Sequence, residues 1–134
     1  MPSPIVLDTC ALIFDALSPE RLSKGATKAI EAAERHDLLF CSDMSLWEIA
    51  ILMQKGRLSV DTDTTTFLNL AIEARKIRVL PITVDIAHRS VTLPPTIPYD
   101  PADRIILATA LVQQATLITS DRRLLDTTLV RALS

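Results

Sequence analysis

Short apolar runs alternate with helical segments along the whole chain, and no other feature constrains the fold as strongly. Buried strands are predicted over residues 4–7, 38–41, 77–80 and 116–119. Helices are predicted over residues 11–17, 18–35, 42–54, 63–75, 84–91 and 100–114. This alternation favours a parallel sheet with helices on both faces. We therefore predict an α/β fold in three α/β/α layers, with a central, mostly parallel sheet of four to five strands in a single domain over residues 1–134.

Several local expectations complete this outline. Ser18 followed by Pro19 predicts a helix start, with the serine as N-cap and the proline in the first turn. Residues 93–99 contain three prolines and are predicted to form a loop. Trp47 is expected in the core because it lies on an apolar helix segment. A short helix at residues 124–125 and an edge strand near residues 129–130 are expected at the end of the chain.

The composition excludes several kinds of site. The chain has only two glycines, so it cannot form the glycine-rich loops that bind nucleotide phosphates. Its two cysteines and two histidines lie far apart and give no zinc-binding spacing. The net charge of −2 provides no overall basic field, so nucleic acid would have to be held by a local patch or by metal ions. No export signal and no membrane-spanning run is visible, which predicts a cytoplasmic protein.

Acidic residues occur where the predicted strands end. Asp8 follows the first strand, and Asp121 follows the last one through Ser120. Glu48 and Asp103 lie near the starts of helices that leave the same edge of the sheet. Converging carboxylates repel one another, and Mg²⁺ or Mn²⁺ relieves the repulsion because hard cations prefer oxygen ligands. The pattern predicts a carboxylate-held metal site of the kind that hydrolyses phosphodiesters.

Four motifs in sequence order carry a resemblance to a known family. They are VLDTCAL at 6–12, SLWEIA at 45–50 with KGRL at 55–58, DPADRII at 100–106, and LITSD at 117–121. With these motifs the chain resembles PIN-domain ribonucleases, in particular the VapC toxins of toxin–antitoxin pairs. Many relatives have a histidine where this chain has Pro98 and a bulky aromatic residue where it has Ala102, but neither change removes an acid.

The resemblance implies Mg²⁺- or Mn²⁺-dependent cleavage of structured RNA, such as tRNA or rRNA, to inhibit translation. It implies that the catalytic and metal-binding acids are Asp8, Glu48, Asp103 and Asp121, supported by the hydroxyls of Thr9 and Ser120. It also implies a homodimer and a VapB-like antitoxin, whose helix would lie in an apolar groove to which Leu12, Ile13 and Phe14 contribute.

Simpler interpretations of the same residues stay open from the sequence. Asp8 and Asp121 are also good helix caps, and Asp100 either supports the acids or only caps its helix. Ser45 with Glu48 fits a capping box, although Ser42 is the better N-cap. Arg104 is expected either to neutralise the neighbouring carboxylates or hold a phosphate, or to form an ordinary surface ion pair. Tyr99, in the loop beside the acids, is a better candidate than Trp47 for stacking on bases.

Two other functions remain as alternatives to RNA cleavage. The first is an RNA-binding module that blocks translation without cutting. The second is a magnesium-dependent phosphatase with Asp8 as phosphoryl acceptor, which the cysteine at position 10 disfavours because a second acid is expected there.

Overall fold

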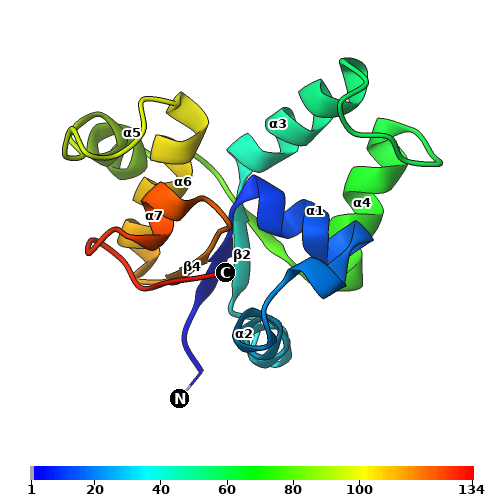
Figure 1. Ribbon diagram of the computed structural model, residues 1–134, viewed down its shortest axis with the longest axis horizontal. Helices are drawn as coiled ribbons and strands as arrows, with labels where there is room; N and C mark the ends of the chain where they lie inside the picture. The colour runs from blue at the N-terminus through cyan, green and yellow to red at the C-terminus, as the bar shows by residue number, and fades with distance from the viewer. Residues whose placement is uncertain (1) are drawn as a thin grey trace.

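The computed structural model of the chain describes residues 2–134 and confirms the predicted three-layer fold (Figure 1). Five strands form one sheet in the order β3-β2-β1-β4-β5, and every neighbouring pair is parallel. The strands are β1 (Ile5–Leu7), β2 (Leu39–Ser42), β3 (Arg78–Leu80), β4 (Thr116–Ile118) and β5 (Ala132–Leu133). All five carboxyl ends therefore lie along one edge of the sheet.

Helices cover both faces of this sheet. They are α1 (Thr9–Leu17), α2 (Lys24–Arg35), α3 (Asp43–Gln54), α4 (Thr64–Ala74), α5 (Val84–Val91), α6 (Pro101–Gln113) and α7 (Arg122–Leu125). In Figure 1, α5, α6 and α7 lie on one side of the strands, and α1 and α4 lie on the other. The side-chain packing follows the same division.

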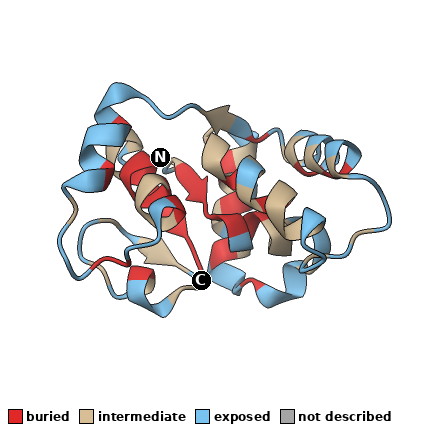
Figure 2. Cartoon of the chain, turned by 90° about the horizontal axis from the view of Figure 1, so that it is seen from above, coloured by how far each residue is buried: buried red, intermediate tan, exposed pale blue. Residues whose placement is uncertain are grey.

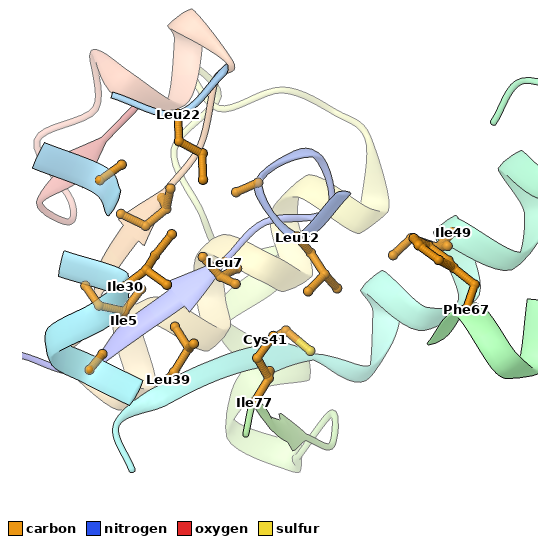
Figure 3. Close-up of a cluster of buried hydrophobic side chains, with 14 residues drawn as sticks. Ile5, Leu7, Leu12, Leu22, Ile30, Leu39, Cys41, Ile49, Phe67 and Ile77 are labelled. Atoms are coloured by element: carbon orange, nitrogen blue, oxygen red, sulfur yellow. The ribbon is translucent and has the colours of Figure 1, made fainter. Parts of the chain in front are cut away.

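Alternate residues of each strand supply two separate cores. Ile5 and Leu7 of β1 pack with Leu39 of β2 and with apolar side chains of α1 and α2 (Figure 3). Val6, between them, points to the opposite face and packs with Ile106 and other residues of α6. Figure 2 shows buried residues in the strands and on parts of the helices, and exposed residues along the outer loops. A strand that is buried on both faces has a continuous apolar sequence. These strands could be predicted because they have such sequences.

The predicted helix over residues 18–35 is wrong in its first third. Residues Pro19–Arg21 form a short 3₁₀ helix, and α2 starts only at Lys24. Ser18 makes no capping hydrogen bond, whereas the Ser23 hydroxyl accepts one from the Ala26 N–H at 3.0 Å. The Ser-Pro signal is a real helix start, but it begins one turn rather than the long helix.

Two further expectations need correction. Trp47 is 60% exposed and does not belong to the core, because α3 buries only the side that carries Ser45 and Ile49. The edge strand expected near residues 129–130 is β5, which lies slightly later at Ala132–Leu133. The predicted loop over residues 93–99 is confirmed, and within residues 2–134 no helix is long and apolar enough to span a bilayer.

Candidate active site

The topology creates a switch point at the carboxyl edge of the sheet, between β1 and β4. The chain passes from β1 to β2 and β3 on one side and then returns to place β4 on the other side of β1. Ligands of open α/β sheets bind at such a switch point. The Asp8 N–H donates a hydrogen bond to the Ile118 carbonyl at 3.0 Å, which fixes Asp8 at this switch point.

Asp8 is both a helix cap and a member of the acidic cluster. Its Oδ1 accepts a hydrogen bond from the Ala11 N–H at 2.7 Å, and the residue is only 8% exposed. Burial raises the pKa of Asp8 to about 6, helped by the charges of Glu48 and Asp121, although hydrogen bonds from Thr119 and Ala11 lower it. A carboxylate that is so enclosed and already caps α1 is poorly placed to accept a phosphoryl group, which argues against the phosphatase alternative.

Glu48 reaches the site from α3 and is held by a buried hydroxyl pair. The Thr9 hydroxyl donates a short hydrogen bond to Glu48 Oε1, and it lies 3.0 Å from the Ser45 hydroxyl. The capping-box interpretation is wrong, because Ser42 is the N-cap of α3 and Ser45 lies inside the helix. Burial raises the pKa of Glu48, the Thr9 hydrogen bond lowers it, and Asp100 raises it. Ser45 also supports the site, although its sequence pattern suggested only a capping role.

Asp100 and Asp103 enter from the start of α6. Asp100 is the N-cap, and its Oδ1 accepts hydrogen bonds from the N–H groups of Ala102 at 2.8 Å and Asp103 at 3.4 Å. Burial, together with the charges of Asp100, Asp121, Glu48 and Asp8, raises the pKa of Asp103 to about 6. Asp100 therefore acts as a cap that adds negative charge beside Asp103.

Asp121 completes the cluster from the segment after β4. It caps α7 through the Arg123 N–H and forms an ion pair with the Arg123 guanidinium at 3.2 Å. Burial raises the pKa of Asp121, but the hydrogen bonds and charge of Arg123 outweigh it and hold that pKa below its ordinary value. The hydroxyl that supports the acids here is that of Thr119, which is buried and accepts the Asp121 N–H at 3.1 Å. Ser120, predicted for this role, is exposed.

Arg104 has a different role from either one predicted. Its guanidinium donates hydrogen bonds to the backbone carbonyls of Pro98 at 2.9 Å, Ser90 at 3.2 Å and Ile97 at 3.3 Å. Within residues 2–134 it forms no ion pair with a carboxylate. Arg104 therefore ties the loop before α6 to the end of α5, and it fixes the segment that carries Asp100.

Known proteins share both this fold and much of this sequence. The family model of the PIN domain matches residues 5–128. The chain belongs to the PIN domain family. It is also 36% identical over 120 residues to Ribonuclease VapC22 of Mycobacterium tuberculosis, covering 90% of this chain and 88% of that protein. The predicted resemblance to VapC-type PIN proteins is confirmed.

Solved structures show the same PIN fold. VapBC2 from Rickettsia felis bound to a promoter DNA fragment aligns with a TM-score of 0.72 and 11% identity over 96% of each chain. DNA-bound VapBC from Salmonella typhimurium aligns with a TM-score of 0.70 and 15% identity, covering 97% of this chain and 96% of that one. A toxin–antitoxin complex from Klebsiella pneumoniae aligns with a TM-score of 0.60 and 22% identity over 94% of each chain. At these identities, the likeness establishes the fold.

The donor chemistry of this PIN domain fits a hard divalent cation. Asp8 and Asp103 both have a pKa raised to about 6, first by burial and then by neighbouring carboxylates, so their negative charge is poorly compensated. Desolvation and the same acids raise the pKa of Cys10 to about 11, which keeps that thiol protonated at neutral pH. The ligands on offer are therefore carboxylate oxygens, as Mg²⁺ and Mn²⁺ prefer.

The carboxylates are gathered loosely. Within residues 2–134, no group of three or more Asp, Glu, His or Cys side chains is close enough together to hold an ion directly. Mg²⁺ usually keeps several water ligands and binds through only one or two carboxylates, so this spacing is compatible with it. The residues fit a cation that is held partly through water.

Proposed function

We propose that this chain is a VapC-type toxin, a divalent-metal-dependent endoribonuclease that cleaves structured RNA and thereby inhibits translation. The observation that carries the proposal is the gathering of Asp8, Glu48, Asp103 and Asp121 near the β1/β4 switch point, where their charges act on one another. Membership of the PIN family and the 36% identity to a protein named a ribonuclease support it. A module that only bound RNA would gain nothing from uncompensated carboxylates beside a phosphate, because they repel it.

The four acids would hold Mg²⁺ or Mn²⁺, which supplies an activated water and neutralises charge on the leaving oxygen of the phosphodiester. Asp8 is oriented for this by the backbone of α1, and Glu48 is oriented by the Thr9 hydroxyl. Asp121 accepts hydrogen bonds from the Arg123 guanidinium, whose side chain is 66% exposed and can also meet an RNA phosphate. The Arg104 contacts keep the Asp100–Asp103 segment in place.

The substrate class and the location of the protein are what the family resemblance implies. We propose a folded cellular RNA, a tRNA or an rRNA loop, and therefore a cytoplasmic site of action. With a net charge of −2 the chain has no overall attraction for RNA, so recognition has to come from the surface beside the acids.

The test is cleavage of total cellular RNA by the purified chain in Mg²⁺, in Mn²⁺ and in EDTA, with the new ends mapped by sequencing. We expect a few discrete cuts with either metal and none in EDTA, because the acids alone would repel the phosphate. Discrete cuts that persist in EDTA would contradict the metal requirement. A folded chain that binds RNA but never cuts it would instead support occupancy without cleavage.

We also propose an antitoxin partner, as in the complexes named above. The structure offers an apolar groove of about 340 Å³ between α1 and α4, lined by Leu17, Phe67 and Leu70. Leu70 is 58% exposed, which is unusual for a leucine in a packed domain. The groove predicted from the sequence was partly wrong, because Leu12 is buried in the core, and Ile13 and Phe14 pack against that core.

An apolar helix of the antitoxin would fit this α1–α4 groove. A Leu70→Asp chain that still bound its antitoxin with full affinity would contradict this placement. The homodimer implied by the family resemblance also stays a proposal, which light scattering of the purified chain measures.

A further inference from the structure

A large pocket lies beside the acidic site and has no part in the proposed chemistry. It has a volume of about 580 Å³ and lies between the end of α5, the loop over 92–100 and the first turn of α6. Its walls are mainly apolar, formed by Val91, Leu93, Pro95 and Ile105, with Tyr99 and Arg104 beside them. Tyr99 is 84% exposed, so its ring is open to a ligand.

Arg104 gives this pocket a fixed shape and an aromatic platform. Its three hydrogen bonds to the carbonyls of Ser90, Ile97 and Pro98 hold α5, the loop and α6 together around the pocket. Its guanidinium carbon lies 5.4 Å from the centre of the Tyr99 ring, a cation–π contact. Planar guanidinium groups and aromatic rings are the surfaces on which proteins stack unpaired RNA bases.

The pocket and the acids share one helical turn. Tyr99 immediately precedes the cap residue Asp100, and Arg104 immediately follows Asp103. Successive residues of an α-helix point about 100° apart and one turn rises about 5.4 Å, so Asp103 and Arg104 open onto adjacent faces at the same level. A nucleotide next to a phosphate that a cation holds near Asp103 is therefore within reach of the pocket.

The polar groups of Arg104 and Ser90 in this pocket are already paired within the chain. The guanidinium nitrogens of Arg104 donate to backbone carbonyls, and the Ser90 hydroxyl donates to the Ala87 carbonyl at 2.7 Å. Few hydrogen-bonding groups are left to read the edge of a base. Recognition here has to rest on stacking and shape, which every base offers.

We propose that this pocket takes one unpaired nucleobase of the substrate RNA, stacked on Tyr99, and that it selects for an extruded base rather than for a particular base. This inference rests on the proposed RNA-cleaving function and deepens it. It assigns Tyr99 as a substrate-positioning residue and Arg104 as the residue that preforms the pocket. A base that is paired in a helix could not enter without being extruded first.

The experiment measures binding of RNA pentamers with a central 2-aminopurine to the full chain in EDTA, by fluorescence. The chains compared are wild type, Tyr99→Ala, Tyr99→Phe and the control Val84→Ala, since Val84 is 90% exposed on α5 but does not line the pocket. We expect Tyr99→Ala to weaken binding about tenfold and to abolish the change in fluorescence, because a stacked base is lost. Tyr99→Phe and Val84→Ala should bind like wild type, and exchanging the central base should change affinity little.

Several outcomes would overturn the inference. One is equal binding by Tyr99→Ala and wild type, and another is a strong preference for one base. A third is a change from dimer to monomer in Tyr99→Ala seen by light scattering, which would make this face a contact between two copies.

Cleavage in Mg²⁺, measured in parallel, keeps the two proposals apart. If wild type and Tyr99→Ala cut RNA equally well, the proposed function is supported and the pocket proposal is contradicted. If the probe stacks on Tyr99 but the chain never cuts RNA, the pocket proposal is supported and the proposed function is contradicted.

Discussion

Replacing Asp103 by asparagine is expected to reduce RNA cleavage at least about 100-fold while leaving the chain folded. The charge of Asp103 lies beside those of Asp8, Glu48 and Asp121, so the substitution removes one of the proposed cation ligands. Metal-ion stabilisation of a reacting phosphate is worth several kcal/mol, and each tenfold in rate corresponds to about 1.4 kcal/mol. The asparagine has the same shape, and the cap of α6 is supplied by Asp100, so the helix should persist.

The matched control is Asp85→Asn, because Asp85 is an exposed aspartate in the first turn of another helix, α5, where it pairs with Arg89. Cleavage by this control should stay within about twofold of wild type, since surface ion pairs contribute little. Equal loss of activity in both variants would mean that the effect comes from the change in the net charge of the chain and not from the acidic site. Undiminished cleavage by Asp103→Asn would contradict the assignment of Asp103 as a catalytic residue.

Replacing Asp8 by asparagine is expected to stabilise the chain by about 3 kcal/mol at pH 7.5 in the absence of divalent cations. The pKa of Asp8 is raised from 3.8 to about 6, and each unit corresponds to about 1.4 kcal/mol. An asparagine still accepts the Ala11 N–H that Asp8 caps, but it carries no charge into the buried cluster. The free energy of unfolding from urea titrations of both chains measures the difference.

The pH dependence of this difference has a definite sign. Because the folded-state pKa of Asp8 is above its unfolded value, protonation favours the folded chain. The stability that this group contributes is therefore fully present below about pH 4 and is lost as the pH rises through about 6. The advantage of Asp8→Asn should vanish below pH 4 and grow up to pH 7. Saturating Mg²⁺ should remove it at pH 7.5, and a variant that is less stable than wild type in EDTA would contradict the account.

The strands and the positions of the acids could be predicted from the sequence because both depend on local signals. The run over 5–7 is apolar without interruption because β1 is buried on both faces, and Asp8 stands where it ends. Parallel strands bring their carboxyl ends together, so residues as distant as Asp8 and Asp121 could be placed at one edge. Asp8 and Asp121 act as helix caps and as members of the cluster at once, whereas the sequence presented these roles as alternatives.

Other features depend on packing that a sequence does not display. Nothing in the order of residues distinguishes Ser120 from Thr119, and only the burial of Thr119 selects it as the hydroxyl beside the acids. Trp47 looks like a core residue because its neighbours are apolar, yet α3 turns it outward. Arg104 follows an acid in sequence, but its guanidinium donates hydrogen bonds to backbone carbonyls of a loop and of α5. These contacts form only after the chain has folded.

Calorimetric titration of Mn²⁺ into the wild-type chain and into Asp103→Asn at pH 7.5 tests the central claim most directly, because it asks whether these acids form one metal site without relying on a substrate. The account predicts binding to the wild type and at least about tenfold weaker binding to the variant, since one charged ligand is lost. It also predicts that binding weakens below pH 6, where Asp8 and Asp103 become protonated. Equal affinity of the two chains for Mn²⁺, or no binding by the folded wild type, would contradict it.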